Sequence, residues 1–156
     1  MPTWHYSVKL RDEGKVAKAV ILDADVSIKD MREVCSAVRG MSLDEALDFL
    51  RRVLDLKEPI PLKRYSGKIA HKRGLADKWG WPAGRYPVKA AKYLIKLLEN
   101  ARNNAEVKGL DLSKLRIIHI AAHRGITLKR WMPRAFGRST QKFDRRTNVE
   151  VIVGEV

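Results

Sequence analysis

Two stretches decide how this chain folds: Arg116-Ile-Ile-His-Ile-Ala-Ala-His-Arg124 and Thr147-Asn-Val-Glu-Val-Ile-Val153. In both, apolar residues alternate along the chain, which is typical of β-strands. One face of the first predicted strand carries Ile118, Ile120 and Ala122, and the other carries Ile117, His119 and His123. A glycine-bearing segment joins the two stretches, so we expect them to pair as a hairpin.

The predicted hairpin is too long to lie within a small domain. From Lys114 to Val156 there are 43 residues. Each arm is therefore roughly 20 residues, or about 65 Å when fully extended at about 3.3 Å per residue. A compact chain of this size has a radius of gyration of only about 15 Å. We therefore expect the distal half of the hairpin to project from the domain.

The projecting part is strongly cationic. Between Arg124 and Arg146 eight residues are basic and only Asp144 is acidic, and Trp, Met and Phe residues are interleaved with them. A free two-stranded ribbon is marginally stable in water, and like charges weaken it further. Phosphates would neutralise the cations, and unpaired bases would stack on the aromatic rings. The alternative is a basic tail that has no fixed structure until it meets RNA.

The rest of the chain predicts a strand and three helices. Residues 15–26 are rich in Val, Ile and Ala and read as a strand. Ser27 and Ser42 each precede an acidic residue by three positions and an apolar helical stripe, which is a helix-start signal. Pro87 and Gly109 bound a third helix, roughly 30 Å long. The expected fold class is α+β: a small domain with three helices packed on a three-stranded antiparallel sheet, and a long protruding C-terminal β-hairpin.

The chain has 156 residues and a net charge of +14, and this charge is unevenly distributed along the sequence. Residues 1–58 carry ten basic and eleven acidic residues, whereas residues 59–86 carry seven and one, and residues 113–156 carry ten and three. Charge gathered in stretches indicates a binding surface for a polyanion, most commonly nucleic acid. We interpret residues 1–156 as a single RNA-binding domain. Its parts are a neutral strand-helix-helix portion (1–58), a basic loop insertion (59–86), a long helix (87–112) and the extended basic hairpin (113–156).

Several other chemistries are disfavoured. A single cysteine, Cys35, excludes a disulfide framework and a Cys-based zinc cage. On a strand, His119 and His123 are about 13 Å apart, too far to share one metal ion, so we expect them to face solvent or RNA. The aliphatic run Ala19–Leu22 is far shorter than a membrane span. We expect a soluble cytoplasmic protein without metal or cofactor.

The basic segments also lack the marks of catalysis. Asp77 and Asp144 stand alone there, which argues against a two-metal nuclease. His71 lies among lysines and arginines and is expected to contact phosphate. Trp79 and Trp81 either anchor the loop in a local core or act as platforms for bases. The candidate RNA-binding residues are Lys63, Arg64, Lys68, His71, Lys72, Arg73, Lys78, Arg85, Arg124, Lys129, Arg130, Trp131, Arg134, Arg138, Lys142, Arg145 and Arg146.

The segment Ile126-Thr-Leu-Lys-Arg-Trp-Met-Pro-Arg-Ala-Phe-Gly-Arg138 resembles the arm and tip of large-ribosomal-subunit protein family number twenty-two. The family pattern is a Thr-Leu-Lys-Arg run, then Pro-Arg-Ala, then Gly-Arg. Arg145-Arg-Thr147 and Val38-Arg-Gly40 also match, and the resemblance covers nearly the whole chain. Residues 59–86 resemble archaeal and eukaryotic members, and the short length favours an archaeal one. The chain departs from the family at Phe136, near which the family has Arg.

The resemblance implies a structural constituent of the large ribosomal subunit. Such a protein binds large-subunit ribosomal RNA, contacts neighbouring large-subunit proteins and supports assembly. The resemblance also implies that the hairpin tip lines the peptide exit tunnel and meets the nascent polypeptide. The tip residues are Trp131, Met132, Pro133, Arg134, Ala135, Phe136 and Gly137.

Two alternatives of other classes remain open from the residues. One is an architectural DNA-binding protein whose basic ribbon enters the minor groove, with Met132-Pro133 as a wedge. It predicts dimerisation and a preference for duplex DNA. The other is a nuclease or RNA-modifying enzyme that uses His71 or His123 for acid–base chemistry.

Overall fold

A computed structural model describes residues 4–10 and 14–155 of the chain. Its main sheet has three strands in the order β1-β7-β4, and both neighbouring pairs are antiparallel. The strands are β1 (Val16–Ala24), β4 (Leu115–Leu128) and β7 (Asp144–Glu155). The strand that comes last along the chain is therefore the central one.

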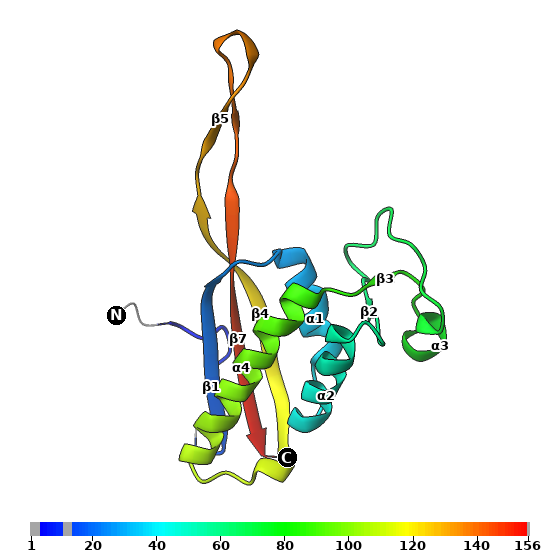
Figure 1. The fold of residues 1–156 in the computed structure, drawn as a ribbon. Coiled ribbons are helices and arrows are strands. Elements are labelled where there is room, and N and C mark those ends of the chain that lie inside the picture. The colour runs from blue at the N-terminus through cyan, green and yellow to red at the C-terminus, as the bar shows by residue number, and fades with distance from the viewer. Residues whose placement is uncertain (1–3, 11–13, 156) are drawn as a thin grey trace.

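Three helices cover one face of this sheet (Figure 1). The long helix α4 packs on β1, α1 packs on β4, and α2 packs on α4. Their bounds are α1 (Ile28–Val38), α2 (Leu43–Leu54) and α4 (Val88–Val107). The α+β class, the three covering helices and the antiparallel sheet are thus confirmed.

The helix-start signals mark the right positions. Ser42 caps α2 and its hydroxyl accepts a hydrogen bond from the Glu45 backbone N–H at 3.4 Å. Ser27 caps α1 through its backbone only, without a side-chain hydrogen bond. Pro87 precedes α4, and after the helix Gly109 adopts a φ of +71°. The left-handed conformation at Gly109 turns the chain away from the helix axis.

Residues 59–86 are more structured than a loop, so the predicted loop insertion needs correction. Strand β2 (Ile60–Pro61) pairs with β3 (Gly84–Arg85), and a short helix α3 (Leu75–Trp79) lies between them. Gly84 fits closely here, because a Cβ on it would lie 2.4 Å from Leu75 Cδ2. Elements this short contain too few residues to show a hydrophobic period.

The two tryptophans of this segment anchor it to the domain. The Trp79 ring lies 5.9 Å from the Phe49 ring of α2, and Trp81 Nε1 donates to the Leu62 carbonyl at 2.9 Å. Both side chains are half-buried. Of the two alternatives, the local core is therefore the one that the structure supports.

The apolar alternation predicted for β4 is wrong at its first half. Ile117 is buried, whereas Ile118 is 42% exposed, and the pairing with β7 shifts register between Ile117 and His119. An extra residue at such a bulge moves the following side chains to the opposite face. Ile120 consequently shares the buried side with Ile117 and not with Ile118.

The hairpin projects from the domain as the length arithmetic predicts (Figure 1). Beyond the sheet, the two arms continue as the paired strands β5 (Trp131–Pro133) and β6 (Ser139–Gln141). A 3₁₀ turn, η2 (Ala135–Gly137), closes the end. Most side chains from Ile126 to Lys142 are exposed, so this ribbon has no core of its own.

Candidate nucleic-acid interface

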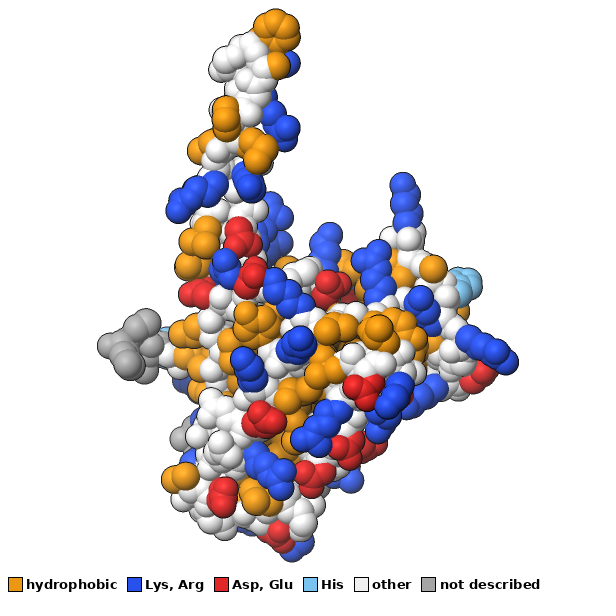
Figure 2. Space-filling view, viewed as in Figure 1, with side chains coloured by type: hydrophobic (Ala, Val, Ile, Leu, Met, Phe, Trp, Pro, Cys, Tyr) orange, Lys and Arg blue, Asp and Glu red, His pale blue; other side chains and the backbone are white. Residues whose placement is uncertain are grey.

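Unpaired cations run along the projecting ribbon, as Figure 2 shows. These residues are all exposed, and within the described part of the chain none has an acidic partner: Lys129, Arg130, Arg134, Arg138 and Lys142. Two of them are oriented locally, since Arg130 donates to the Lys129 carbonyl and Arg134 Nε donates to Thr140 Oγ1 at 2.9 Å. The ribbon thus presents positive charge on a surface with almost no compensating acid.

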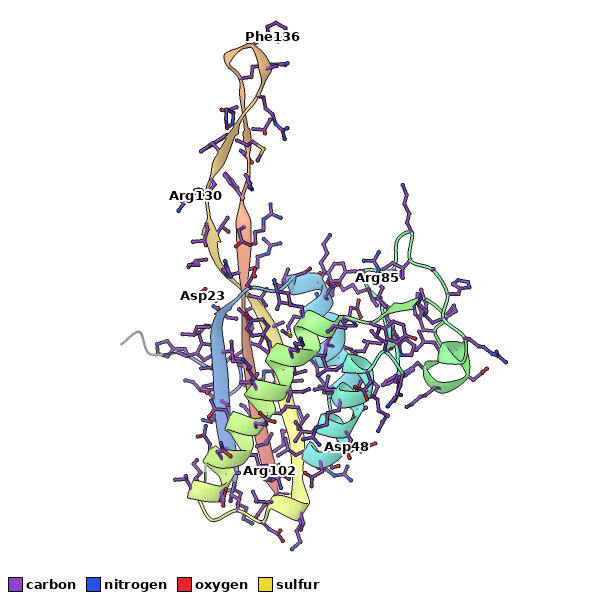
Figure 3. All side chains as sticks on the ribbon, in the orientation of Figure 1. Asp23, Asp48, Arg85, Arg102, Arg130 and Phe136 are labelled. Carbon is purple, nitrogen blue, oxygen red and sulfur yellow. The ribbon has the colours of Figure 1, made fainter. Side chains whose placement is uncertain are left out.

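The tip of the hairpin presents an aromatic ring to solvent. Phe136 has a φ of +56° and is 96% exposed, and Gly137 follows with a φ of +68°. Two consecutive left-handed residues produce a sharp reversal, which the hydrogen bond from Arg134 N to the Arg138 carbonyl closes at 2.8 Å. Figure 3 shows Phe136 at the far end of the ribbon and Arg130 partway along it.

Two further aromatic rings pack on each other below the tip. Trp131 and Phe143 meet edge-to-face with ring centroids 5.8 Å apart. Trp131 nevertheless remains 59% exposed. More than half of the Trp131 surface is therefore accessible to a base or another planar group.

The predicted cations of residues 59–86 form a second group. Six of the eight predicted residues are exposed and have no acidic partner among the described residues: Lys63, Arg64, Lys68, His71, Arg73 and Arg85. Lys72 is half-buried with its Nζ 5.6 Å from the Tyr86 ring centroid. Lys78 is bound by Glu58, which also accepts from Arg52.

The ion pairs of Glu58 with Lys78 and Arg52 lower the pKa of its carboxyl group. Its partial burial alone raises the pKa, but hydrogen bonds from Lys78 and Arg52 outweigh this and lower it below the ordinary value. Arg146 is also neutralised within the chain, by Asp144 at 2.6 Å and Asp25 at 3.4 Å. Lys78 and Arg146 are therefore less available to an outside phosphate than the other predicted residues.

A buried glutamate holds the backbone of residues 63–65, near the start of the basic segment, against α1. The Glu33 carboxylate, on α1, accepts hydrogen bonds from the backbone N–H groups of Lys63, Arg64 and Tyr65 at 3.2, 2.8 and 3.0 Å. Glu33 itself is 5% exposed. The backbone is thus held on α1 while the side chains of Lys63 and Arg64 extend into solvent.

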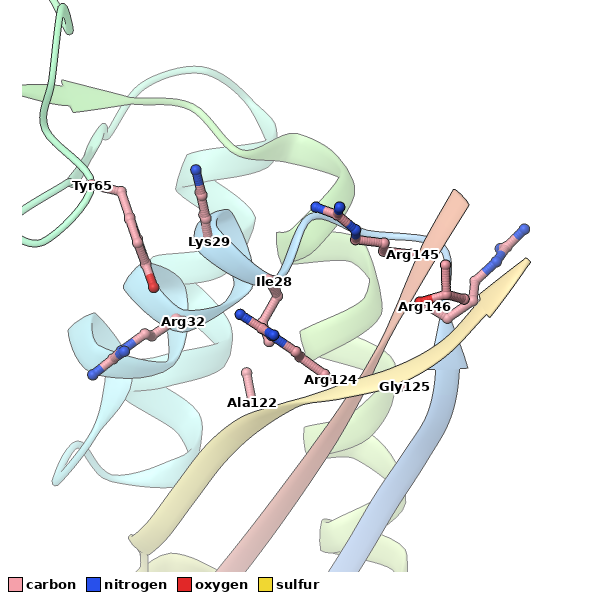
Figure 4. A pocket seen from close by; sticks show the side chains of 10 residues that line it. Ile28, Lys29, Arg32, Tyr65, Ala122, Arg124, Gly125, Arg145 and Arg146 are labelled. Atoms are coloured by element: carbon pink, nitrogen blue, oxygen red, sulfur yellow. The ribbon is translucent and has the colours of Figure 1, made fainter. Parts of the chain in front are cut away.

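A cavity at the root of the hairpin brings cations from three segments together. It has a volume of about 490 Å³, and Figure 4 shows the side chains that line it. Its cationic lining residues are Lys29, Arg32, Arg124, Arg145 and Arg146, and Tyr65 closes one side. Lys29 and Arg32 were not among the predicted site residues, because they lie on a helix within the neutral first third of the chain.

The prediction for the two strand histidines is wrong. His119 Nε2 and His123 Nε2 lie 3.0 and 3.3 Å from the same oxygen, Oε1 of the fully buried Glu150. The two histidines are far apart along the backbone of β4. Both imidazoles nevertheless extend toward Glu150, which pairs with Ala121 midway between them. Residues 4–10 lie against the same group, since Trp4 Nε1 donates to Glu150 Oε2 at 2.8 Å. Both histidines are therefore held by an acid of the same chain, and 19% of the His119 side chain and 38% of the His123 side chain remain exposed.

Within residues 4–10 and 14–155, no three His, Cys, Asp or Glu side chains are arranged to hold a metal ion. In the same ranges no helix has both the length and the apolar character that crossing a bilayer requires.

Comparison with known proteins gives one consistent result. Residues 19–154 match the family model described as "Ribosomal protein L22p/L17e". The chain is similar to large ribosomal subunit protein uL22 of the archaeon Staphylothermus marinus, with 65% identity over 100% of this chain and 99% of the relative. It is also similar to the proteins of that name from Ignicoccus hospitalis (59% identity, 100% and 99% covered) and Aeropyrum pernix (58% identity, 100% and 100% covered).

These findings agree with the resemblance seen in the hairpin sequence and with an archaeal type of member. They give no support to the DNA-binding or enzymatic alternatives. The chain belongs to the ribosomal protein L22p/L17e family, whose members are structural components of the ribosome and not enzymes.

Proposed function

We propose that the projecting ribbon and the basic segment 59–86 are the surfaces through which this protein binds large-subunit ribosomal RNA and supports assembly of the subunit. As a family member the chain is a structural constituent of the large subunit in the cytoplasm, associated with its RNA and its other proteins. The observation that carries the proposal is the ribbon itself. Five exposed cations stand on the two arms of a ribbon that has no core, and none of them has an acidic partner among the described residues.

The proposed contacts are of two kinds. Arginines bind phosphate oxygens through paired N–H groups, and lysines act as point charges. Trp131 is more than half exposed, and stacking of a base on such a ring contributes about 1–3 kcal/mol. Lys78 and Arg146 are expected to contribute least, because Glu58, Asp25 and Asp144 already neutralise them.

The salt dependence of RNA binding tests this assignment. Affinity for deproteinised large-subunit ribosomal RNA is measured between 50 and 500 mM salt. Each neutralised phosphate is expected to contribute about −0.7 to −0.9 to the slope of log K against log salt. Arg130→Gln is expected to make the slope shallower by one such step. Arg51→Gln is the matched control, because Arg51 lies on α2 and is already paired with Asp48 at 3.1 Å. A wild-type slope near zero would contradict the proposal.

We also propose that the hairpin tip lines the peptide exit tunnel and meets the nascent polypeptide. The family resemblance supports this proposal, and so does the exposure of Phe136 at the end of the ribbon. The test is a photoreactive amino acid at Phe136 in assembled subunits that carry a stalled, labelled nascent chain. A crosslink to the peptide is expected from Phe136 and not from Arg102 on α4. Crosslinks from Phe136 to RNA alone would refute the tip assignment and leave the RNA-binding proposal intact.

A further inference from the structure

The cavity at the hairpin root is lined by positive charge that acidic residues of the chain compensate only in part. Of its five cations, only Arg146 has acidic partners, which are Asp25 and Asp144. The other four have no acidic partner among the described residues: Lys29, Arg32, Arg124 and Arg145. Like charges that converge on one space repel each other, so this arrangement is costly to the isolated protein.

The cavity is built by contacts that fix its walls. Glu33 accepts the backbone N–H of Tyr65 at 3.0 Å, which holds Tyr65 against α1. The Tyr65 ring in turn lies 5.5 Å from Lys29 Nζ. On the opposite wall, the Asp23 carboxylate accepts the Ile126 N–H at 3.2 Å and so holds the hairpin root. Cations from α1 and from both arms of the hairpin therefore face one space whose walls are set by hydrogen bonds.

The chemistry of the lining selects an anion with several oxygens. Arginine guanidinium groups recognise phosphate oxygens through paired N–H donors. A cavity of about 490 Å³ with four unpaired cations around it is larger than one phosphate group needs. A nucleic-acid backbone supplies phosphates in succession, one for each nucleotide.

We propose that this cavity binds a segment of ribosomal RNA backbone, with successive phosphates contacting α1 on one side and the hairpin root on the other. The proposal rests on the proposed function and deepens it, because it names a third RNA contact, where α1, the root of the hairpin and Tyr65 meet. A single RNA strand seated there bridges the globular domain and the hairpin. It thereby fixes the direction in which the ribbon leaves the domain.

The salt dependence of RNA binding by a variant that lacks the two α1 cations tests this proposal separately from the proposed function. Lys29→Gln/Arg32→Gln removes two charges without touching the hairpin. The slope of log K against log salt for large-subunit ribosomal RNA is expected to become shallower by about 1.4 to 1.8, two phosphate contacts' worth. The control Arg51→Gln/Lys57→Gln removes the same charge from side chains already paired with Asp48 and Asp55, and it is expected to leave the slope unchanged.

The outcomes separate the two proposals. If the α1 double variant keeps the wild-type slope while Arg130→Gln lowers it, the cavity proposal is wrong and the ribbon proposal stands. If the wild-type protein does not bind the RNA at all, both are wrong. Urea unfolding of the double variant checks the fold, and a stability no lower than that of the wild type is expected, because both side chains are exposed and their removal relieves like-charge repulsion.

Directed cleavage gives a second readout. A tethered iron-EDTA group at Thr127→Cys probes the hairpin wall of the cavity, and the same group at Lys29→Cys probes the α1 wall. The native Cys35 does not interfere, because it is 2% exposed and burial raises the pKa of its thiol to about 12. Overlapping sets of cut nucleotides are expected from the two positions, and a different set or none from Asp48→Cys on α2. Disjoint cuts from the two walls would overturn the proposal.

Discussion

Glu150 shows how one buried carboxylate fastens an extended segment to the outer face of the sheet. It is fully buried in the central strand β7 and lies 3.0 Å from His119 Nε2. It accepts hydrogen bonds from Trp4 Nε1 at 2.8 Å and from the Ser7 backbone N–H at 3.2 Å. Burial alone would raise its pKa, but the hydrogen bonds from Ser7, Trp4 and His119 outweigh burial and lower the pKa to about 2.

The first prediction concerns Glu150→Gln and pH. The folded-state pKa of about 2 lies below the ordinary value of 4.5, so the ionised carboxylate stabilises the fold fully above about pH 4.5. This contribution is lost as the pH falls through about 2. Glu150→Gln is expected to lower the free energy of unfolding by about 2–3 kcal/mol at pH 7. The difference from wild type should close toward pH 2.

Urea unfolding at pH 7, 4 and 2 measures that difference. Glu99→Gln on the exposed face of α4 serves as the control, and it should leave the free energy of unfolding at pH 7 close to that of the wild type. A Glu150→Gln deficit of the same size at pH 2 as at pH 7 would show that lost packing, and not charge, is the cause.

At the residue scale, sequence predicts exposed cations better than buried acids. Nearly every predicted cation of the two basic segments is exposed, because charge density along the chain survives folding. Glu33 and Glu150 were not predicted as anchors, because their partners are about 30 and 143 residues away in the chain. His119 is likewise 31 residues away from Glu150 in the chain. The local pattern therefore could not reveal this contact and assigned His119 to solvent or RNA.

At the scale of elements, the hairpin leaves the sheet at a tightly packed root. Asp23 lies within a break in the β1–β7 register and has a φ of +53°, and its N–H donates to Asn148 Oδ1 at 2.7 Å. A Cβ on Gly125 would lie 2.7 Å from Asp23 Oδ1 and 2.9 Å from Asn148 Oδ1. Figure 3 shows Asp23 at this root. Only glycine fits between these two side chains without displacing them.

The second prediction is that Gly125→Ala destabilises the protein. The added methyl group displaces Asp23 and Asn148, and overpacking of this kind costs about 1–3 kcal/mol. Urea unfolding gives the value, and faster hydrogen exchange of the Ile126 amide reports the lost hydrogen bond. Gly67→Ala is the matched control, since a Cβ there meets nothing within 4 Å. Equal stabilities of the two variants would contradict a packed root.

The third prediction concerns the attachment of the basic segment to α1. Glu33→Ala removes the acceptor for three backbone N–H groups, so the chain at Lys63 and Arg64 is expected to detach. Limited trypsin digestion should then cut after these two residues several-fold faster than in wild type. Glu45→Ala, an exposed position on α2, should leave the rate unchanged. Cleavage at the wild-type rate in Glu33→Ala would mean that other contacts hold the segment.

Element length decides what the sequence could predict at this scale. Helices α1, α2 and α4 and the sheet strands have nine or more residues, enough for a repeating apolar pattern. Strands β2 and β3 have two residues each and α3 has five, so composition suggested only a loop. The bulge after Ile117 was missed for a different reason. It depends on pairing with β7, which alternation in one strand does not record.

At the scale of the whole molecule, stability is unevenly distributed. The domain buries a continuous core between the sheet and the three helices, whereas the ribbon from residues 129 to 142 has mostly exposed side chains. The projection of the ribbon followed from length and charge alone. The angle at which it leaves the domain did not, because that depends on the root around Gly125.

The fourth prediction is a contrast in amide hydrogen exchange within one hairpin. Amides of residues 149–153, in the central strand, should exchange slowly, because they open only with the core. Amides of residues 131–133 and 139–141 should exchange orders of magnitude faster in the free protein, since an isolated ribbon is marginally stable. Addition of large-subunit ribosomal RNA should slow the second group selectively. Equal protection of both groups without RNA would show that the ribbon is rigid by itself.

The central position of β7 has a consequence for biosynthesis. Both β1 and β4 hydrogen-bond to β7, and β7 is made after every other element of the fold. Until the translating ribosome has polymerised residues 144–155, the two edge strands have no neighbour, and the apolar faces of the helices have no complete sheet to cover. Folding of this domain is therefore delayed to the final stage of its own translation, and the unfinished chain must stay soluble by its charge until then.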